Sequence, residues 1–349
     1  MKKVKWGVIG AGGIADRRTI PGMMLAKNAE LVAVMEINME LAEKLRAKYN
    51  AKRAYDNYKD LIADPEVECV YIASPVTNHL EQVIAAAEAG KHILCEKPIA
   101  LSIEECNKAK EACEKAGILS ATGFMMRYHA FHQLMKQIIA DGKIGKVHSA
   151  RAQLTCWYPE IEGAWRQKKA LSGGGALIDM GVHCIDLIEY ITGGKTVKTA
   201  AFNDTKTFSY DVDDSSSVLI KLDNGVTGYV ESNFNIPDEA AFCRMEFYGT
   251  KGSILCEGTI GQVEGGTVKA VFANDDAGYA AAQNRDQSGA VMLEADLSGN
   301  MYTKEIESFS DSILNGTPVQ VPLTDAIHIQ KVVTAAYKAS DEGITVAID

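Results

Sequence analysis

The chain has 349 residues, of which 47% are hydrophobic and 23% charged, and its formal net charge is −10. A chain of this length and apolar content can bury a large core and form two globular domains. The negative charge argues against a nucleic acid or an anionic membrane as partner. The eight cysteines include no CxxC pair and no zinc-like cluster, so the sequence predicts no metal site and fits a reducing compartment.

The N-terminus has none of the features of a signal peptide. Its apolar run is short, contains glycines and leads into the charged residues 16–18. No apolar run in the sequence suggests a membrane span. We therefore expect a cytoplasmic protein without a membrane partner.

The chain begins with the pattern of a buried strand, residues 4–9, followed at once by a glycine-rich turn. In this G-x-G-x-x-A motif the first glycine allows a tight turn and the second lets the backbone approach a pyrophosphate. The small third residue lets the next helix pack on the strand, and that helix directs N–H groups at the phosphates. The motif predicts a dinucleotide site lined by Gly10, Gly12, Gly13, Ile14 and Ala15.

A second apolar run, residues 31–35, ends in Glu36, slightly farther from the glycine motif than is usual. A carboxylate there would accept hydrogen bonds from the adenosine ribose hydroxyls and would repel a 2′-phosphate. The residues that follow are Ile37 and Asn38, and neither could pair with a phosphate. The sequence therefore favours NAD over NADP.

Helix and strand patterns then alternate as far as residue 123. We expect helices at 39–49, 80–90 and 103–116, and strands at 67–73, 92–95 and 118–123. This alternation predicts a right-handed parallel sheet, which binds ligands at the carboxyl ends of its strands. The loops at those ends contain Ser74, Pro75, Asn78 and His79, and then Glu96, Lys97 and Pro98.

Lys97 is a candidate acid–base residue because it follows a predicted strand and precedes a proline that favours extended backbone. A lysine in a closed cleft can have a lowered pKa and exchange protons with a substrate. The alternative is an ordinary surface lysine, and position is the only evidence against it.

A helical stretch at residues 172–190, opened by three glycines, contains further candidates. Asp179, His183, Asp186 and Tyr190 fall on one face of it, while most other faces are apolar. A helix of this kind is buried, and its polar stripe must face water, a partner or a cavity. Asp179 and His183 are therefore candidates for proton transfer. The alternative is a polar network that only ties the helix to its neighbours.

From residue 145 the pattern becomes typical of antiparallel strands. We expect strands at 146–156, 197–203, 216–222, 228–234, 242–248 and 253–256, and helices at 131–139, 302–313 and 324–340. The stretch 261–296 stays unassigned. His129 and His132 could suggest a metal, but no further Cys or His cluster lies near them in the sequence.

The predicted fold class is α/β with two domains. Residues 1–123 form a doubly wound Rossmann domain, and residues 124–349 form an α+β domain with a large open, mostly antiparallel sheet. The closing helices could pack back on the first domain.

Four elements occur together and in order: the glycine motif, Glu96-Lys97-Pro98, Trp165-Arg166, and GGGALIDMGVHCID at 173–186. Together they resemble the glucose–fructose oxidoreductase/myo-inositol dehydrogenase/MocA (GFO/IDH/MocA) family over essentially the whole chain. The resemblance implies NAD(P)-dependent hydride transfer at a hydroxyl or keto carbon of a sugar, glycoside or cyclitol. It also implies an open sheet that often builds dimers or tetramers. The departures are mild: Ala15 replaces the third glycine, and Glu36 replaces the commoner Asp.

The resemblance also implies roles for single residues. Lys97 would hydrogen-bond the reacting oxygen, His183 would pass the proton, and Asp179 would orient His183 and bind a neighbouring hydroxyl. Trp165 and Arg166 would lie near the nicotinamide. Further residues would face the cofactor or, for the last of them, the nicotinamide or substrate: Ser74, Pro75, Asn78, His79, Glu96 and Arg127.

Two other functions fit a chain of this kind. One is a glycosidase that oxidises its substrate transiently with tightly held NAD and reduces the product again, so that no NADH accumulates. The other is a sugar or nucleotide sensor without chemistry. The presence of Lys97, Asp179 and His183 together speaks against a sensor.

Overall fold

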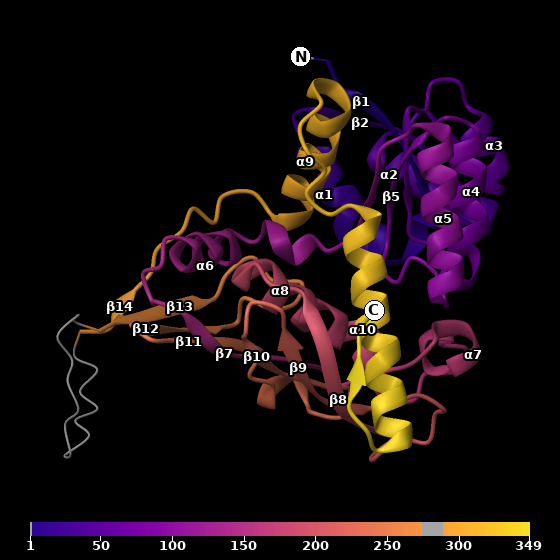
Figure 1. Cartoon of the computed structure of the whole chain (residues 1–349). Helices are drawn as coiled ribbons and strands as arrows, with labels where there is room; N and C mark the ends of the chain where they lie inside the picture. Colours follow the sequence, from indigo (N-terminus) through magenta and orange to yellow (C-terminus); the bar gives the residue numbers. More distant parts are fainter. Residues whose placement is uncertain (1, 274–288) are drawn as a thin grey trace, which may run out of the picture. The chain divides into compact units, whose positions relative to one another are not determined.

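The computed structural model describes residues 2–273 and 289–349, and these fold into two compact units (Figure 1). The predicted boundary after Gly123 lies two residues before the end of the first segment of unit 1. Unit 1 comprises Met1–Met125, Ala170–Gly173 and Gly299–Gln330. Unit 2 comprises Met126–Lys169, Gly174–Ser298 and Lys331–Asp349.

Unit 1 contains a six-stranded sheet of order β3-β2-β1-β4-β5-β6 in which every pair is parallel. This confirms the predicted Rossmann-type sheet. The strand order reverses at β1, which lies between β2 and β4, and such a switch point is where doubly wound sheets bind ligands. The strands are β1 (Val4–Ile9), β2 (Ala29–Met35), β3 (Arg53–Tyr55), β4 (Cys69–Ile72), β5 (His92–Cys95) and β6 (Ser120–Thr122).

Several helices of unit 1 begin at a residue whose side chain caps the first turn. The side chain of Asn38 caps α2 (Met39–Tyr49), and Ser102 with Glu105 forms a capping box for α5 (Ile103–Ala116). Both helices have the bounds that the sequence predicts. The other helical segments are η1 (Ala11–Thr19), α1 (Ile20–Leu25), α3 (Tyr58–Ala63), η2 (Val76–Asn78), α4 (His79–Glu88) and α9 (Met301–Asn315).

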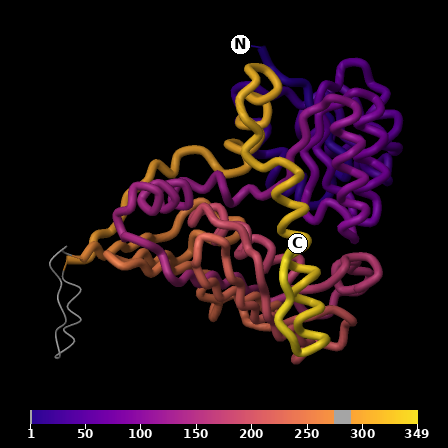
Figure 2. Tube along the Cα trace, in the orientation of Figure 1, coloured from indigo at the N-terminus to yellow at the C-terminus, as the bar shows by residue number. Residues whose placement is uncertain are grey.

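Helix α9 comes from near the C-terminus yet packs in unit 1, as the trace in Figure 2 shows. The Trp6 indole on β1 is fully buried and donates a hydrogen bond to Ser310 Oγ at 3.1 Å. Its ring centroid lies 6.0 Å from that of Phe309. At the start of α9, Thr303 Oγ1 donates to the Gly22 carbonyl at 2.9 Å. The core of the Rossmann unit is therefore completed by residues about 300 positions away in the sequence.

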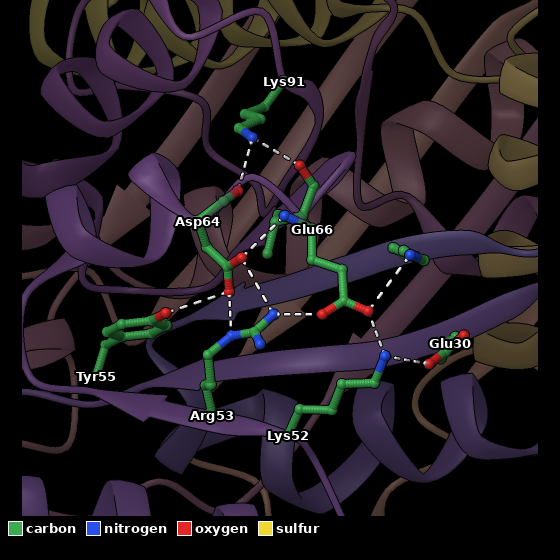
Figure 3. Close-up of polar contacts among 9 residues, drawn as sticks. Glu30, Lys52, Arg53, Tyr55, Asp64, Glu66 and Lys91 are labelled. Atoms are coloured by element: carbon green, nitrogen blue, oxygen red, sulfur yellow. Dashed lines mark hydrogen bonds and ion pairs between the residues drawn. The ribbon is translucent and has the colours of Figure 1, made fainter.

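Ion pairs and hydrogen bonds hold the short edge strand β3 in place (Figure 3). The Arg53 guanidinium pairs with Asp64 and, at 2.7 Å, with Glu66 Oε2. Hydrogen bonds from Lys52 and Arg53 lower the pKa of Glu66 to about 2. Lys91 Nζ donates to the Asp64 carbonyl at 2.9 Å. The sequence analysis missed β3 because its three residues are only partly buried and form no apolar run.

Unit 2 contains a nine-stranded sheet of order β14-β13-β12-β11-β7-β10-β9-β8-β15. All its pairs are antiparallel except β7 with β10, so the predicted mostly antiparallel sheet is confirmed. Its strands are β7 (Val147–Thr155), β8 (Thr196–Asp204), β9 (Ser215–Leu222), β10 (Thr227–Asn233), β11 (Arg244–Gly249), β12 (Gly252–Glu257), β13 (Thr267–Phe272), β14 (Val291–Met292) and β15 (Val346–Ala347). β13 and β14 fall in the stretch 261–296 that the sequence left unassigned, and residues 274–288 of it lie outside the described residues.

Burial alternates along much of β9 and β10, because one face of the sheet packs on α8 (Val182–Thr192) and side chains of the other face are exposed. Phe202, Leu219 and Tyr248 are exposed on the second face, with Phe202 77% accessible. The helices of unit 2 include α6 (Ala130–Ala140) and α8, and α10 (Leu323–Glu342) has residues in both units.

The stretch Lys169–Thr192 is long and apolar enough to cross a membrane by length and composition, although the sequence analysis expected no such run. In the structure, 83% of its most apolar window is buried inside the protein. Such burial is typical of the core helix that the pattern at 172–190 predicts.

Candidate active site

The glycine loop after β1 fits closely against the end of β4. Gly10 has φ 75°, and a Cβ there would come within 2.6 Å of the Ser74 backbone nitrogen. Only glycine suits this position, for both reasons. A Cβ on Gly13 would meet nothing within 4 Å, so that part of the loop is open. Ala15 is fully buried, as the small third residue of the motif should be.

Glu36 lies beside this loop, at the end of β2. Its Oε2 accepts a hydrogen bond from the Gly12 N–H at 2.9 Å, and its Oε1 accepts one from Ile37 N–H at 3.1 Å. The carboxylate thus lies next to the backbone that would approach a pyrophosphate. The glycine cradle and the adjacent acid fit the adenosine half of a dinucleotide.

The loops after β4 and β5 are tied together by His79, which is 2% exposed. Its Nε2 lies 2.8 Å from the Ser74 carbonyl oxygen, and its Nδ1 lies 2.9 Å from that of Pro98. Ser74 Oγ also donates to Gln82 Oε1 at 2.6 Å. In the same loop Pro75 precedes η2, and Asn78 is the last residue of η2. His79 therefore holds the shape of both loops at the switch point.

The carboxylate of Glu96 is anchored beneath the Lys97 backbone. Tyr71 OH donates to Glu96 Oε1 at 2.5 Å, and the Lys97 N–H donates to Glu96 Oε2 at 3.3 Å. A Cβ on Gly123 would come within 3.0 Å of Glu96 Oε1, so this glycine leaves room for the carboxylate. These contacts fix the start of the loop from which Lys97 extends.

A buried acidic residue that the sequence analysis missed lies near Glu96. Glu305 on α9 is 2% exposed, and burial together with the Glu96 charge raises its pKa well above the usual range. Its Oε1 and the Tyr302 hydroxyl have no hydrogen-bond partner among the described residues. The only sequence signal was a Glu on the apolar face of an amphipathic helix, next to Tyr302 and Phe309.

In unit 2 Asp213 caps the helical stretch that follows the glycine triplet. Asp213 Oδ1 accepts from Gly175 N–H at 2.7 Å, and Oδ2 accepts from Leu177 N–H at 2.8 Å. A Cβ on Gly175 would lie 1.9 Å from the Asp213 carbonyl oxygen, and one on Gly174 would lie 2.1 Å from Tyr337 OH. Burial raises the pKa of Asp213, although these N–H donors favour its charged form.

Asp179 lies in the wide helical turn η5 (Leu177–Gly181) that precedes α8, and His183 is the second residue of α8. Such wide turns are frequent at functional sites. The Asp179 side chain is 35% exposed, and its Oδ1 lies 3.7 Å from Arg166 Nε. The Arg166 guanidinium in turn lies 4.4 Å from the centre of the Trp165 ring. The structure thus brings Asp179, Arg166 and Trp165 together in unit 2.

The other half of the polar stripe is a structural network. Arg127 Nη2 donates to Asp186 Oδ1 at 2.5 Å and Nε donates to Oδ2 at 3.0 Å, with 5% and 1% of the two side chains exposed. The Tyr190 ring lies 5.2 Å from the Arg127 guanidinium and 3.8 Å from Lys136 Nζ. The network interpretation therefore applies to Asp186 and Tyr190, and the proton-transfer roles of Asp179 and His183 stay predictions. That Arg127 faces the nicotinamide or substrate stays a prediction.

The imidazole rings of His129 and His132 contact oxygen atoms of neighbouring residues within unit 2. The two ring nitrogens of His132 lie 2.7 Å from the Met126 carbonyl oxygen and 3.0 Å from Thr259 Oγ1. Burial lowers the pKa of His132 to about 3. Within residues 2–273 and 289–349, no group of three or more His, Cys, Asp or Glu is arranged to hold a metal ion.

A glycine loop at the switch point of a parallel sheet, with an acid at the end of the second strand, defines a dinucleotide-binding protein. The model for the oxidoreductase family with an NAD-binding Rossmann fold matches residues 4–124. The model for the GFO/IDH/MocA C-terminal domain matches residues 132–255. The chain belongs to the GFO/IDH/MocA family of NAD(P)-dependent oxidoreductases.

The names of several relatives state an enzymatic activity. Glucose-6-phosphate 3-dehydrogenase of Bacillus subtilis (strain 168) is 31% identical over 72% of this chain and 73% of the relative. D-glucoside 3-dehydrogenase of Escherichia coli (strain K12) is 26% identical over 98% and 96%. The solved structure of levoglucosan dehydrogenase with NADH and levoglucosan is similar with a TM-score of 0.88, at 25% identity and 99% and 100% coverage.

Proposed function

We propose that this enzyme transfers hydride between a nicotinamide dinucleotide and a secondary hydroxyl or keto carbon of a sugar, glycoside or cyclitol. The observation that carries the proposal is the pair of candidate acid–base elements on a matched family fold: Lys97 after β5, and Asp179 in η5 with His183 in the first turn of α8. The named relatives are dehydrogenases of glucose 6-phosphate, of D-glucosides and of levoglucosan.

In this proposal each of the three candidate residues, Lys97, His183 and Asp179, has a separate chemical role. The Lys97 ammonium donates a hydrogen bond to the reacting oxygen and stabilises negative charge that develops there. His183 accepts the hydroxyl proton as general base, or returns it in the reverse direction. Asp179 orients His183 and accepts a hydrogen bond from a neighbouring hydroxyl. The bound cofactor supplies the hydride chemistry.

The cofactor would lie along the glycine loop and the strand ends of unit 1. Gly10, Gly12 and the open side of Gly13 provide the backbone for the phosphates, and Glu36 would bind the adenosine ribose. We assign the remaining cofactor contacts, as the family resemblance implies, to Ile14, Ala15, Ser74, Pro75, Asn78, His79, Glu96, Lys97, Trp165 and Arg166.

A substrate panel tests the function. Purified enzyme is incubated with aldoses, alkyl and aryl glycosides, sugar phosphates and inositols, first with NAD⁺ and then with NADP⁺, and absorbance at the NADH maximum is followed. We expect at least one neutral sugar or glycoside to produce reduced cofactor in proportion to substrate consumed. Substrate turnover without net reduced cofactor would instead indicate transient oxidation, as in a glycosidase.

Glu36 should make the enzyme prefer NAD. Replacing Glu36 by Ser and Ile37 by Arg removes the carboxylate and adds a cation for a 2′-phosphate, so the ratio of kcat/KM for NADP⁺ to that for NAD⁺ should rise by roughly ten- to a hundredfold. Ile37 is 82% exposed, so the arginine has room. The control is Glu40→Ser, which changes a nearby acid at the start of α2. An unchanged cofactor ratio in the Glu36 variant would contradict this role.

We also propose that copies associate through the exposed face of the nine-stranded sheet, as a homodimer or homotetramer. Leu219 on β9 is 53% exposed and lies across from Tyr229 on β10. Leu219→Glu should therefore shift the sedimentation coefficient toward the monomer. Leu25→Glu, at another exposed leucine in unit 1, should leave it unchanged. A wild-type monomer at micromolar concentration would refute the proposal.

Finally, we propose that the protein resides in the cytoplasm, which is a reducing compartment. The eight cysteines, all within the described part of the chain, are free thiols, and six of them are buried. Fractionation of the source cells would test this.

A further inference from the structure

Three aromatic side chains in unit 2 form a continuous row, which we call the aromatic strip: Trp157, Phe208 and Tyr210. The ring centroids of Trp157 and Phe208 lie 5.2 Å apart, edge to face, and those of Phe208 and Tyr210 lie 5.3 Å apart. Tyr210 OH donates to the Tyr158 carbonyl at 3.2 Å. Trp157, at one end, is 43% exposed. An exposed tryptophan backed by further rings is a surface that can receive a ligand.

The backbone beneath the strip is held rigidly. Asp214 accepts hydrogen bonds from the N–H groups of Lys206, Thr207 and Phe208 at 2.9, 2.7 and 3.0 Å. The N–H and hydroxyl of Ser209 donate to Glu160 Oε1 at 2.8 and 2.9 Å, which joins the two loops that carry the rings. A ligand would therefore bind without first ordering these loops.

Hydrogen bonds join the segment that carries Trp157 and Tyr158 to the turn that carries Arg166. In the turn that carries Arg166, Gln167 donates to the Pro159 carbonyl at 2.6 Å and accepts from Ile161 N–H at 2.9 Å. These bonds hold the turn against the residues that follow Tyr158. Burial raises the pKa of Tyr158, and the nearby Arg166 and Asp179 charges also act on it. The strip thus lies on the same backbone segment that holds the turn of Arg166.

We propose that the aromatic strip is a subsite for a second, non-reacting pyranose ring, so that the preferred substrate is a neutral disaccharide or aryl glycoside. This rests on the proposed function. A pyranose has an apolar C–H face that stacks on aromatic rings and hydroxyls around its edge. The loops of the strip also carry the carboxylates Glu160 and Asp211, and Asp238 accepts a hydrogen bond from the Trp157 backbone N–H at 2.9 Å. These carboxylates can accept further hydrogen bonds from the hydroxyls of a sugar.

The test compares Trp157→Ala and Trp157→Phe on a disaccharide and on its free monosaccharide, with saturating cofactor. For Trp157→Ala we expect kcat/KM on the disaccharide to fall roughly five- to tenfold and on the monosaccharide to stay unchanged. Trp157→Phe keeps a ring and should retain most of the disaccharide activity. An equal loss on both sugars, or no loss on either, would overturn the subsite.

A binding measurement separates this proposal from the function itself. Saturation-transfer NMR on the wild-type holoenzyme should show the non-reacting ring of the disaccharide in contact with protein, and Trp157→Ala should weaken that signal. Binding of this kind without oxidation of any sugar would contradict the proposed function and leave the subsite standing. The absence of transfer to the second ring would overturn the subsite even if the enzyme oxidises sugars.

Discussion

Replacing Lys97 with alanine should lower turnover by roughly 10² to 10⁴ while the cofactor still binds. The loss follows because the reacting oxygen would have no ammonium to stabilise its charge. The fold should survive, since the backbone contact from Lys97 N–H to Glu96 remains, and the glycine loop and Glu36 are untouched. Turnover is measured on the best substrate of the panel, and cofactor affinity by fluorescence titration with NADH.

Two further variants sharpen this prediction. Lys97→Arg keeps a cation of higher pKa and different shape, and should remain far below the wild type. Lys108→Ala removes an exposed lysine of α5 that pairs with Glu104, and should keep full turnover. Near-wild-type turnover in Lys97→Ala would refute the assignment. Loss of NADH binding in that variant would instead indicate that Lys97 acts mainly on the cofactor.

Replacing Asp186 with alanine should destabilise unit 2 by about 3 to 5 kcal/mol. The variant leaves the Arg127 guanidinium, 5% exposed, without its buried carboxylate. Urea denaturation followed by circular dichroism measures the effect. The double variant Arg127→Met with Asp186→Leu should recover most of the lost stability, because apolar side chains of similar volume replace a buried pair with little cost.

An exposed ion pair provides the matched comparison. Glu104→Ala breaks the i,i+4 pair with Lys108 on the surface of α5, and should change stability by no more than about 0.5 kcal/mol. If Asp186→Ala were equally mild, the pair would be unimportant for stability. If instead stability held and turnover collapsed, Asp186 and Arg127 would belong to the chemistry.

Features set by neighbouring residues were predictable from the sequence. The bounds of α2 and α5 follow from capping side chains within three residues of each helix start. The turn at Gly10 follows from a glycine motif placed directly after an apolar run. The family resemblance rests on such local motifs, and the matched domain models confirm it. The roles of Lys97, Asp179 and His183 stay predictions.

What the sequence alone determined is therefore the order of the longer helices and strands, the parallel and the mostly antiparallel sheet, and the positions of the candidate residues, while it did not predict β3, β13 and β14. Only the tertiary structure decided which of those residues form hydrogen bonds or ion pairs with distant parts of the chain. Asp213 caps the helical stretch behind the glycine triplet from 36 to 38 positions away, and Arg127 reaches Asp186 across 59. Periodicity relates a residue only to neighbours within a turn or a strand pair. Which residues meet across such sequence separations depends on how the helices and strands pack. A local sequence pattern does not contain that information.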